Sequence, residues 1–287
     1  MDAHIEPEQS RHDVIASGPP VRQLFREVVA DRLPGRRPPQ AAMLFGTEVD
    51  PCWDERSSLG DFYGEILHQD TCRPATADGL VLLAVLAVDD RIPARHRFEA
   101  VTLLFKAATV AERHLAEAWP ATPRHADPES EARARGAVQA HVPDLLTRWS
   151  AECPAVRLAL AGLAVVFPTG RTLPALTPRL KPFAHRHPQG TDIGDYVPHR
   201  HPQGTDIGDY VRFVLVLAAQ DDDRILTVTE KCTDAYWTGT ARGVPTRARS
   251  LHLLGRMLTR VGSGLTSMSV NPKGQPRSGQ LRSSCGA

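Results

Sequence analysis

Lysine is scarce in this sequence. Only four of the 34 basic residues are lysines, and the other thirty are arginines. The acidic residues number 33, so the formal net charge of the chain is +1. A nearly neutral chain has no overall attraction to nucleic acid or to an anionic membrane surface. Any basic binding surface must therefore be local.

Cysteines are also few, and they are scattered along the chain. They are Cys52, Cys72, Cys153, Cys232 and Cys285. None forms a C-x-x-C pair or the ligand spacing of a zinc site. The N-terminal residues are acidic and lack an apolar run, and no apolar stretch reaches the ~20 residues that cross a bilayer. These absences predict a soluble protein of the reducing cytoplasm.

The sequence lacks the common catalytic motifs. It has no H-E-x-x-H, no G-x-S-x-G, no phosphate loop ending in G-K-[ST] and no dinucleotide fingerprint after a strand. The acidic clusters at residues 89–90 and 221–223 fall at expected turns, where we interpret them as solvated helix-end charges. The absence of these motifs does not exclude enzymatic activity, but it favours a non-catalytic protein without a cofactor.

No run of alternating apolar and polar residues indicates a strand, so the predicted fold class is all-α. Apolar residues at helical spacing and proline breakers divide the chain into helices. These are expected at residues 57–69, 75–88, 93–120, 141–150, 153–167, 172–184, 206–220, 224–237 and 246–261. The polar segment 121–131 is expected to be an exposed loop.

The two ends of the chain differ from the middle. Residues 1–56 are rich in proline and charge and predict a loosely ordered arm with one short helix, on which Val21, Phe25 and Val28 share a face. Residues 262–287 are rich in glycine, serine and proline and predict a disordered tail. The helical domain is therefore expected to span residues 57–261.

One thirteen-residue string, HRHPQGTDIGDYV, occurs twice, at residues 185–197 and 199–211. A V-R phrase opens at Val156 and again at Val211, 55 residues later, and subtracting the 14-residue duplicated unit leaves a spacing of 41. That spacing falls within the ~40–47 residues of HEAT and armadillo repeats. Asp206 can cap a helix in the second copy, whereas Pro198 opposes one in the first. We therefore predict that residues 185–198 form an inserted loop.

The doubled segment also contains two H-x-H pairs, which suggest a tetrahedral zinc site as an alternative. The four histidines are His185, His187, His199 and His201. They are doubled only because the whole segment is doubled, and no acid or cysteine is spaced as a further ligand. We favour solvated loop histidines and predict no bound metal.

Residues 59–76, LGDFYGEILHQDTCRPAT, resemble the opening of a group of uncharacterised actinobacterial proteins built of HEAT-like (armadillo-type) helical repeats. That group carries H-Q-G-T where this chain has H-Q-D-T at residues 68–71. The resemblance implies an α-solenoid of stacked helical hairpins with a concave groove, and it implies fold rather than function.

Two classes of function fit this picture. The first is a non-catalytic scaffold that binds another protein in its concave groove. The alternative is a nucleic-acid-binding protein resembling HEAT-like DNA glycosylases, with a basic stripe of Arg249, Arg256 and Arg260 near Trp237. A degenerate paralogue without activity is a third possibility, which the duplication and the low-complexity tail favour.

Overall fold

The computed structural model describes residues 21–35, 58–67, 71–169, 172–186, 205–230 and 243–268. No strand occurs in these ranges, so the predicted all-α class is confirmed for them. The helices are α1 (Val21–Arg32), α3 (Ser58–Ile66), α4 (Thr76–Val88), α5 (Ala94–Ala108), α6 (Val110–Ala118), α7 (Pro128–Thr147), α8 (Pro154–Val166), α9 (Thr172–Arg186), α10 (Thr205–Ala218), α11 (Asp222–Glu230) and α13 (Thr246–Met268). A short 3₁₀ turn, Arg148–Ser150, follows α7.

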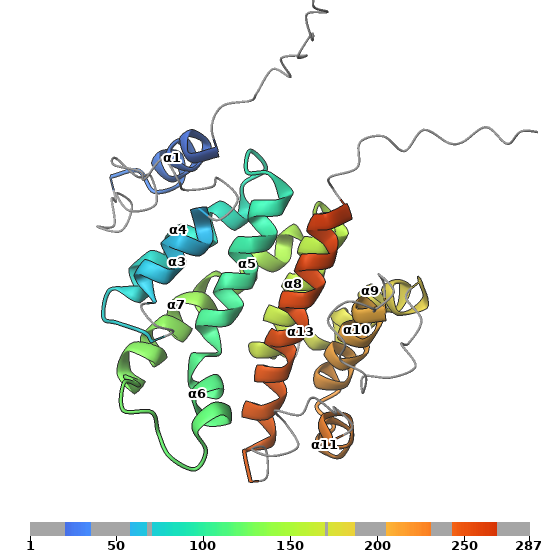
Figure 1. Cartoon of the computed structure of the whole chain (residues 1–287). Coiled ribbons are helices and arrows are strands. Elements are labelled where there is room, and N and C mark those ends of the chain that lie inside the picture. Colours follow the sequence, from blue (N-terminus) through green and yellow to red (C-terminus); the bar gives the residue numbers. More distant parts are fainter. Residues whose placement is uncertain are drawn as a thin grey trace, which may run out of the picture.

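Helix α5 lies at the centre of the bundle (Figure 1), where it packs against α3, α4, α7, α8 and α13. Its residues Val101, Leu104 and Phe105 are almost completely buried. Helices α4 and α8 are apolar on nearly every face, and most of their residues are buried as well. A helix that is apolar all round is stable only when neighbours cover it on more than one side. These three helices therefore form the core.

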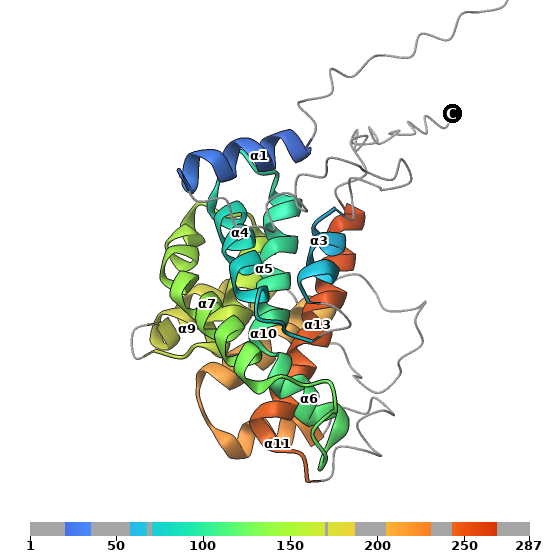
Figure 2. The same ribbon diagram turned by 90° about the vertical axis from the view of Figure 1, so that its left-hand side faces the viewer.

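The last helix, α13, folds back onto early parts of the chain. It packs against α5 and α6 as well as against α8, α10 and α11. In a linear repeat stack each unit contacts only its neighbours. The described helices therefore close into a bundle around α5 and α13 (Figures 1 and 2), and this closure positions the pocket described below.

Helix α1 is the short helix expected within residues 1–56, and it packs onto the core. It lies at one end of the bundle (Figure 2) and packs against α4. Val21, Phe25, Val28 and Val29 are buried, and the Phe25 ring meets the His96 ring edge-on at 5.6 Å between centroids. The predicted apolar face of α1 is thus buried, and its packing against α4 stabilises the helix.

Three helix or loop boundaries differ from those expected from the sequence. The helix expected at residues 93–120 is broken at Thr109, whose hydroxyl donates to the carbonyl oxygen of Phe105 at 2.9 Å. The segment 121–131 is only partly a loop, because Asp127 accepts the backbone N–H of Ser130 at 3.2 Å and caps α7. Helix α13 continues to Met268, beyond the end expected at residue 261.

The doubled segment contributes to two helices. Helix α9 ends at Arg186, inside the first copy, and α10 begins at Thr205, inside the second. The rest of the predicted insertion lies outside the described residues. In the second copy Tyr210 is fully buried, and its hydroxyl donates to the carbonyl oxygen of Leu158 at 2.9 Å. A Cβ at Gly162 would overlap that hydroxyl, so this glycine permits the contact between α8 and α10.

Candidate functional site

The structure does not bring all residues of the predicted basic stripe on the last helix to one site. Arg256 lines a pocket on the surface of the bundle, whereas Arg249 does not line it. The side chain of Arg260 and the whole of Trp237 lie outside the described residues. The predicted set is therefore represented in this pocket by Arg256.

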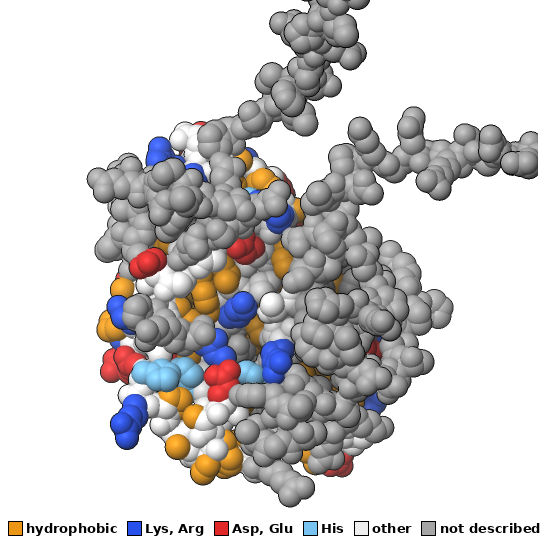
Figure 3. Space-filling view, viewed as in Figure 1, with side chains coloured by type: hydrophobic (Ala, Val, Ile, Leu, Met, Phe, Trp, Pro, Cys, Tyr) orange, Lys and Arg blue, Asp and Glu red, His pale blue; other side chains and the backbone are white. Residues whose placement is uncertain are grey.

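The pocket has a volume of about 550 Å³, within the range of about 300–1,000 Å³ typical of ligand sites. Helices α3, α5, α6 and α13 supply most of its walls. The lining residues are Gly60, Tyr63, Leu103, Phe105, Lys106, Thr109, Arg113, Glu117, Leu251, His252, Gly255, Arg256 and Thr259. Figure 3 shows basic side chains, a histidine and an acidic side chain gathered where α5, α6 and α13 meet.

Basic residues outnumber acidic residues in the described lining of this pocket. Lys106 comes from α5, Arg113 from α6 and Arg256 from α13. Among the described lining residues Glu117 is the one acid, and its Oε1 lies 3.8 Å from Nδ1 of His252. Three positive charges and one negative charge leave a formal charge of +2 when His252 is neutral. The described lining therefore brings together basic side chains from three helices on a chain that is nearly neutral overall.

The same pocket has an apolar side. Leu103, Phe105 and Leu251 are buried and line it. The α13 lining residues recur at a helical spacing from Leu251 to Thr259, so they share one face of the helix. On this face Gly255 allows close approach, since a Cβ there would lie 3.0 Å from Cε1 of Phe105. The site thus combines cations with an apolar surface.

Sequence reasoning identified Arg256 but missed Lys106 and Arg113. These two residues are seven positions apart and fall in the segment expected to be a single helix. Positions seven apart lie close to one face of a helix, so their pairing was a readable signal. Their meeting with Arg256 of α13 depends on the fold and could not be predicted from the sequence.

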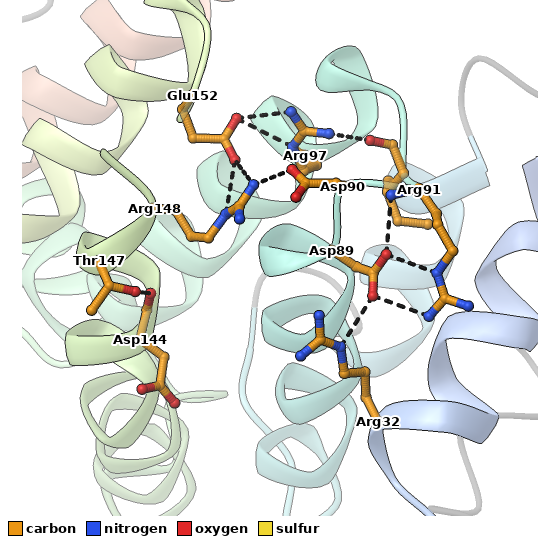
Figure 4. A network of polar contacts seen from close by, with 10 residues as sticks. Arg32, Asp89, Asp90, Arg91, Arg97, Asp144, Thr147, Arg148 and Glu152 are labelled. Carbon is orange, nitrogen blue, oxygen red and sulfur yellow. Dashed lines mark hydrogen bonds and ion pairs between the residues drawn. The ribbon is translucent and has the colours of Figure 1, made fainter. Parts of the chain in front are cut away.

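A second charged region links the loop after α4 to neighbouring elements (Figure 4). Asp89 was interpreted as a solvated helix-end charge, but its side chain is only 5% exposed. It accepts from Nε of Arg91 at 2.9 Å and from Nε of Arg32 at 3.0 Å. The hydrogen bond from Arg91 contributes most to holding the pKa of Asp89 well below its usual range. Asp90 agrees better with the interpretation as a solvated helix-end charge, because it is exposed; it also pairs with Arg148.

Glu152 is the most deeply buried acid of this region, with a side-chain exposure of 0%. Nη2 of Arg97 donates to its Oε2 at 2.9 Å, and Nη2 of Arg148 donates to its Oε1 at 3.3 Å (Figure 4). Both carboxylate oxygens therefore have an arginine partner. This arrangement joins the loops that follow α4 and α7, and it leaves neither oxygen without a hydrogen bond. We assign Glu152 a structural role.

A third group surrounds the start of α7. Nδ1 of His114 lies 2.9 Å from Oε1 of Glu131, and both side chains are buried. Burial, with a smaller contribution from Glu131, raises the pKa of Cys72 to about 12. A nucleophilic cysteine needs a lowered pKa, because the thiolate is the reactive form. Cys72 is therefore a buried, protonated thiol and not a nucleophile.

Among the described residues, no group of three or more His, Cys, Asp or Glu side chains is placed to hold a metal ion. The side chain of His185, together with His187, His199 and His201, lies outside those residues. No helix in the described part of the chain has the length and apolarity needed to cross a membrane.

Comparison with known proteins finds no matching family model, no matching curated protein and no matching solved structure.

Proposed function

We propose that this chain is a non-catalytic binding protein, and that a partner protein inserts an acidic group into the pocket between α3, α5, α6 and α13. One observation carries the proposal. Lys106, Arg113 and Arg256 reach the same pocket of about 550 Å³ from three different helices. Cations held on separate rigid elements cost little further ordering when an anion binds.

The lining favours binding over chemistry. Arginine and lysine donate hydrogen bonds to anions, and the guanidinium group matches carboxylate and phosphate oxygens in a bidentate geometry. The hydroxyls of Thr109 and Thr259 each already donate to a backbone carbonyl oxygen, that of Phe105 and that of Gly255. Both threonine hydroxyls near the His252–Glu117 pair are therefore engaged with the backbone.

The nucleic-acid alternative receives less support. A duplex would contact an extended track of cations, because affinity comes from many phosphate contacts. Arg256 lines a single surface pocket of about 550 Å³ that Arg249 does not line, although the two are on the same helix. If nucleic acid is the ligand after all, its affinity will fall steeply with added salt, and Arg249→Gln will weaken it as much as Arg256→Gln.

We also propose that α8 and α10 descend from one repeated unit of the HEAT-like kind, as the resemblance of residues 59–76 implies. Val156 and Val211 of the two V-R phrases are both buried, and α8 packs against α10. The concave groove of a solenoid is not required for the proposed function, because the pocket is formed by the return of α13 onto α5 and α6.

The test is direct binding of defined peptides to the full chain. An array of synthetic peptides with aspartate, glutamate or phosphorylated residues is compared with the same peptides in amide or unphosphorylated form. We expect the anionic members to bind, and the double variant Lys106→Glu/Arg256→Glu to lose that binding while remaining folded by circular dichroism. Absence of anionic binding, or binding that survives the double charge reversal, refutes the proposal.

A further inference from the structure

We infer that helix α9 opens away from the bundle while the helices against which it packs, α8 and α10, stay folded. The inference is independent of the proposed binding function, because no residue of α9 lines the pocket. It depends on the prolines inside α9, on the contacts that hold the helix closed, and on the length of chain that connects it to α10.

The prolines weaken the backbone of α9. Pro178 and Pro182 both lie inside the helix. Because proline has no amide hydrogen, the carbonyl oxygens of Pro174 and Pro178 cannot receive the usual hydrogen bond from the residue four positions later. The proline rings also crowd those two carbonyl groups. Neither α8 nor α10 has a proline beyond its first turn, so α9 has the weakest backbone of the three helices.

A narrow apolar face attaches α9 to the bundle. Among its described side chains, those of Leu173, Leu176 and Leu180 are buried. The three prolines are exposed and spaced by four, so they share an outer face. The helix lies at the edge of the bundle (Figure 1) and packs mainly against α10. Most residues of α8 are buried, so α9 can leave at a smaller loss of buried apolar surface than α8.

One cation–π contact joins α9 to the short turn after α7. Cζ of Arg179 lies 5.6 Å from the centroid of the Trp149 ring. Arg179 is exposed, and a contact of this kind at an exposed site is weak. It therefore favours the closed position of α9 without preventing opening.

The duplicated string lengthens the connection between α9 and α10. Eighteen residues, 187–204, separate Arg186 from Thr205, and subtracting the 14-residue duplicated unit leaves four. Eighteen residues reach at most about 60 Å, whereas four reach about 14 Å. A four-residue connection is typical of a closed pair of antiparallel helices. The duplication therefore supplies the length of chain that α9 needs to separate from α10.

The experiment is hydrogen–deuterium exchange of the full chain, measured by mass spectrometry on peptides. We expect the amides of α9 to exchange at least about a hundredfold faster than those of α8 and α10. The exchange rate of α9 should also depend little on added urea, because a local opening exposes little surface. The rates of α8 and α10 should rise steeply with urea.

Three variants test the forces on α9. The double variant Pro178→Ala/Pro182→Ala restores two amide donors on an exposed face, so it should slow the exchange of α9 at least about tenfold. Arg179→Gln removes the contact with Trp149 and should speed that exchange about twofold to fivefold. Pro143→Ala is the matched control, because Pro143 lies inside α7 and its loss should leave α9 unchanged.

Deletion of residues 187–200 tests the connection. It removes one copy of the string and keeps both Arg186 and Thr205. Closing a four-residue connection costs less entropy than closing one of eighteen. We therefore expect the exchange of α9 to slow about fivefold to tenfold in the shortened chain.

Two outcomes overturn the inference. One is exchange of α9 at the rate of α10, and the other is exchange of α9 that the double proline variant does not slow. If the proline variant slows exchange and the deletion does not, α9 still opens, and the duplication has no part in it. The proposed binding function is unaffected in each case, because α9 lies outside the pocket lining.

Discussion

Two charged regions of this protein differ in how their charges are matched. The network in Figure 4 and its extension to α1 contain four acids and four arginines that pair with one another. The acids are Asp31, Asp89, Asp90 and Glu152, and the bases are Arg32, Arg91, Arg97 and Arg148. The pocket holds three cations against one acid.

The difference separates two uses of arginine. In the network each guanidinium group neutralises an acid from another element or from the next turn, and the result ties α1 and the loops after α4 and α7 together. In the pocket the basic residues come from three helices and line one hollow of a size that suits a ligand. Charges paired between elements therefore indicate a structural role, and basic residues gathered around a hollow indicate a candidate binding site.

The largest effect on stability is expected at Glu152. Replacing it by glutamine keeps the shape but leaves Arg97 and Arg148 without the buried carboxylate that both contact. Breaking a buried ion pair costs about 3–5 kcal/mol, because the remaining charge is left uncompensated. Urea unfolding followed by circular dichroism measures the loss.

Asp90→Asn is the matched control for this variant. Asp90 also pairs with Arg148, but its side chain is 75% exposed, so water replaces the lost partner. Its removal should cost no more than about 1 kcal/mol. Equal losses in the two variants would mean that burial does not govern this network, and the structural assignment of Glu152 would then be withdrawn.

A smaller effect is expected from Asp89→Asn. Hydrogen bonds from Arg91 and Arg32 to this buried carboxylate are charge-assisted, and we expect a loss of about 1.5–3 kcal/mol at neutral pH.

The pH dependence follows from the lowered pKa of Asp89 in the folded protein. An acid whose folded pKa lies below its unfolded value of about 3.9 stabilises the fold above that value. The stabilisation is lost as the pH falls from about 4 toward the folded pKa. Unfolding free energies measured on descending pH should therefore decline less steeply in Asp89→Asn than in the parent chain. Parallel declines would contradict this account.

Neutralising the pocket should change stability least among the charge variants. Lys106→Gln and Arg256→Gln each remove a cation from the lining of a surface pocket. We expect changes within about 1 kcal/mol, of either sign, in the same urea assay. A loss as large as that of Glu152→Gln would place these residues in the structural class and remove the basis for a binding site.

The sequence predicted the helices whose signals are local. The segments 75–88 and 153–167 are nearly continuous apolar runs with proline close to each start, and they became α4 and α8. The start of α7 was also readable, since Asp127 followed by Pro128 is a typical capping sequence, but the surrounding polarity favoured a loop. The break at Thr109 was not readable, because threonine is tolerated inside helices.

The charged regions were harder to predict because their partners are distant in sequence. Asp89 and Arg32 are 57 positions apart, and Arg97 and Glu152 are 55 apart. Local reasoning therefore classed Asp89 as solvated. The pocket shows the same limit, since Arg256 was found from the stripe on its own helix, whereas Lys106 and Arg113 join it only through the packing of α13 against α5 and α6.

The smallest effect on stability is expected from deleting one copy of the duplicated string. This deletion removes no residue of either charged region. Deleting residues 185–198 gives the same product as deleting 187–200, because the two copies are identical, so the end of α9 at Arg186 is preserved. The product keeps one copy of the string that contains Tyr210, whose contact with Leu158 joins α10 to α8.

Loop entropy changes by only about 0.6 kcal/mol for each doubling of loop length, so shortening this connection should be neutral or slightly stabilising. We expect a thermal midpoint equal to or higher than that of the parent chain. A marked fall in the midpoint would show that both copies carry structure, and the 41-residue spacing would then lose its meaning as a repeat period. Because the deletion leaves the pocket lining and the ion network intact, any loss can be attributed to the segment itself.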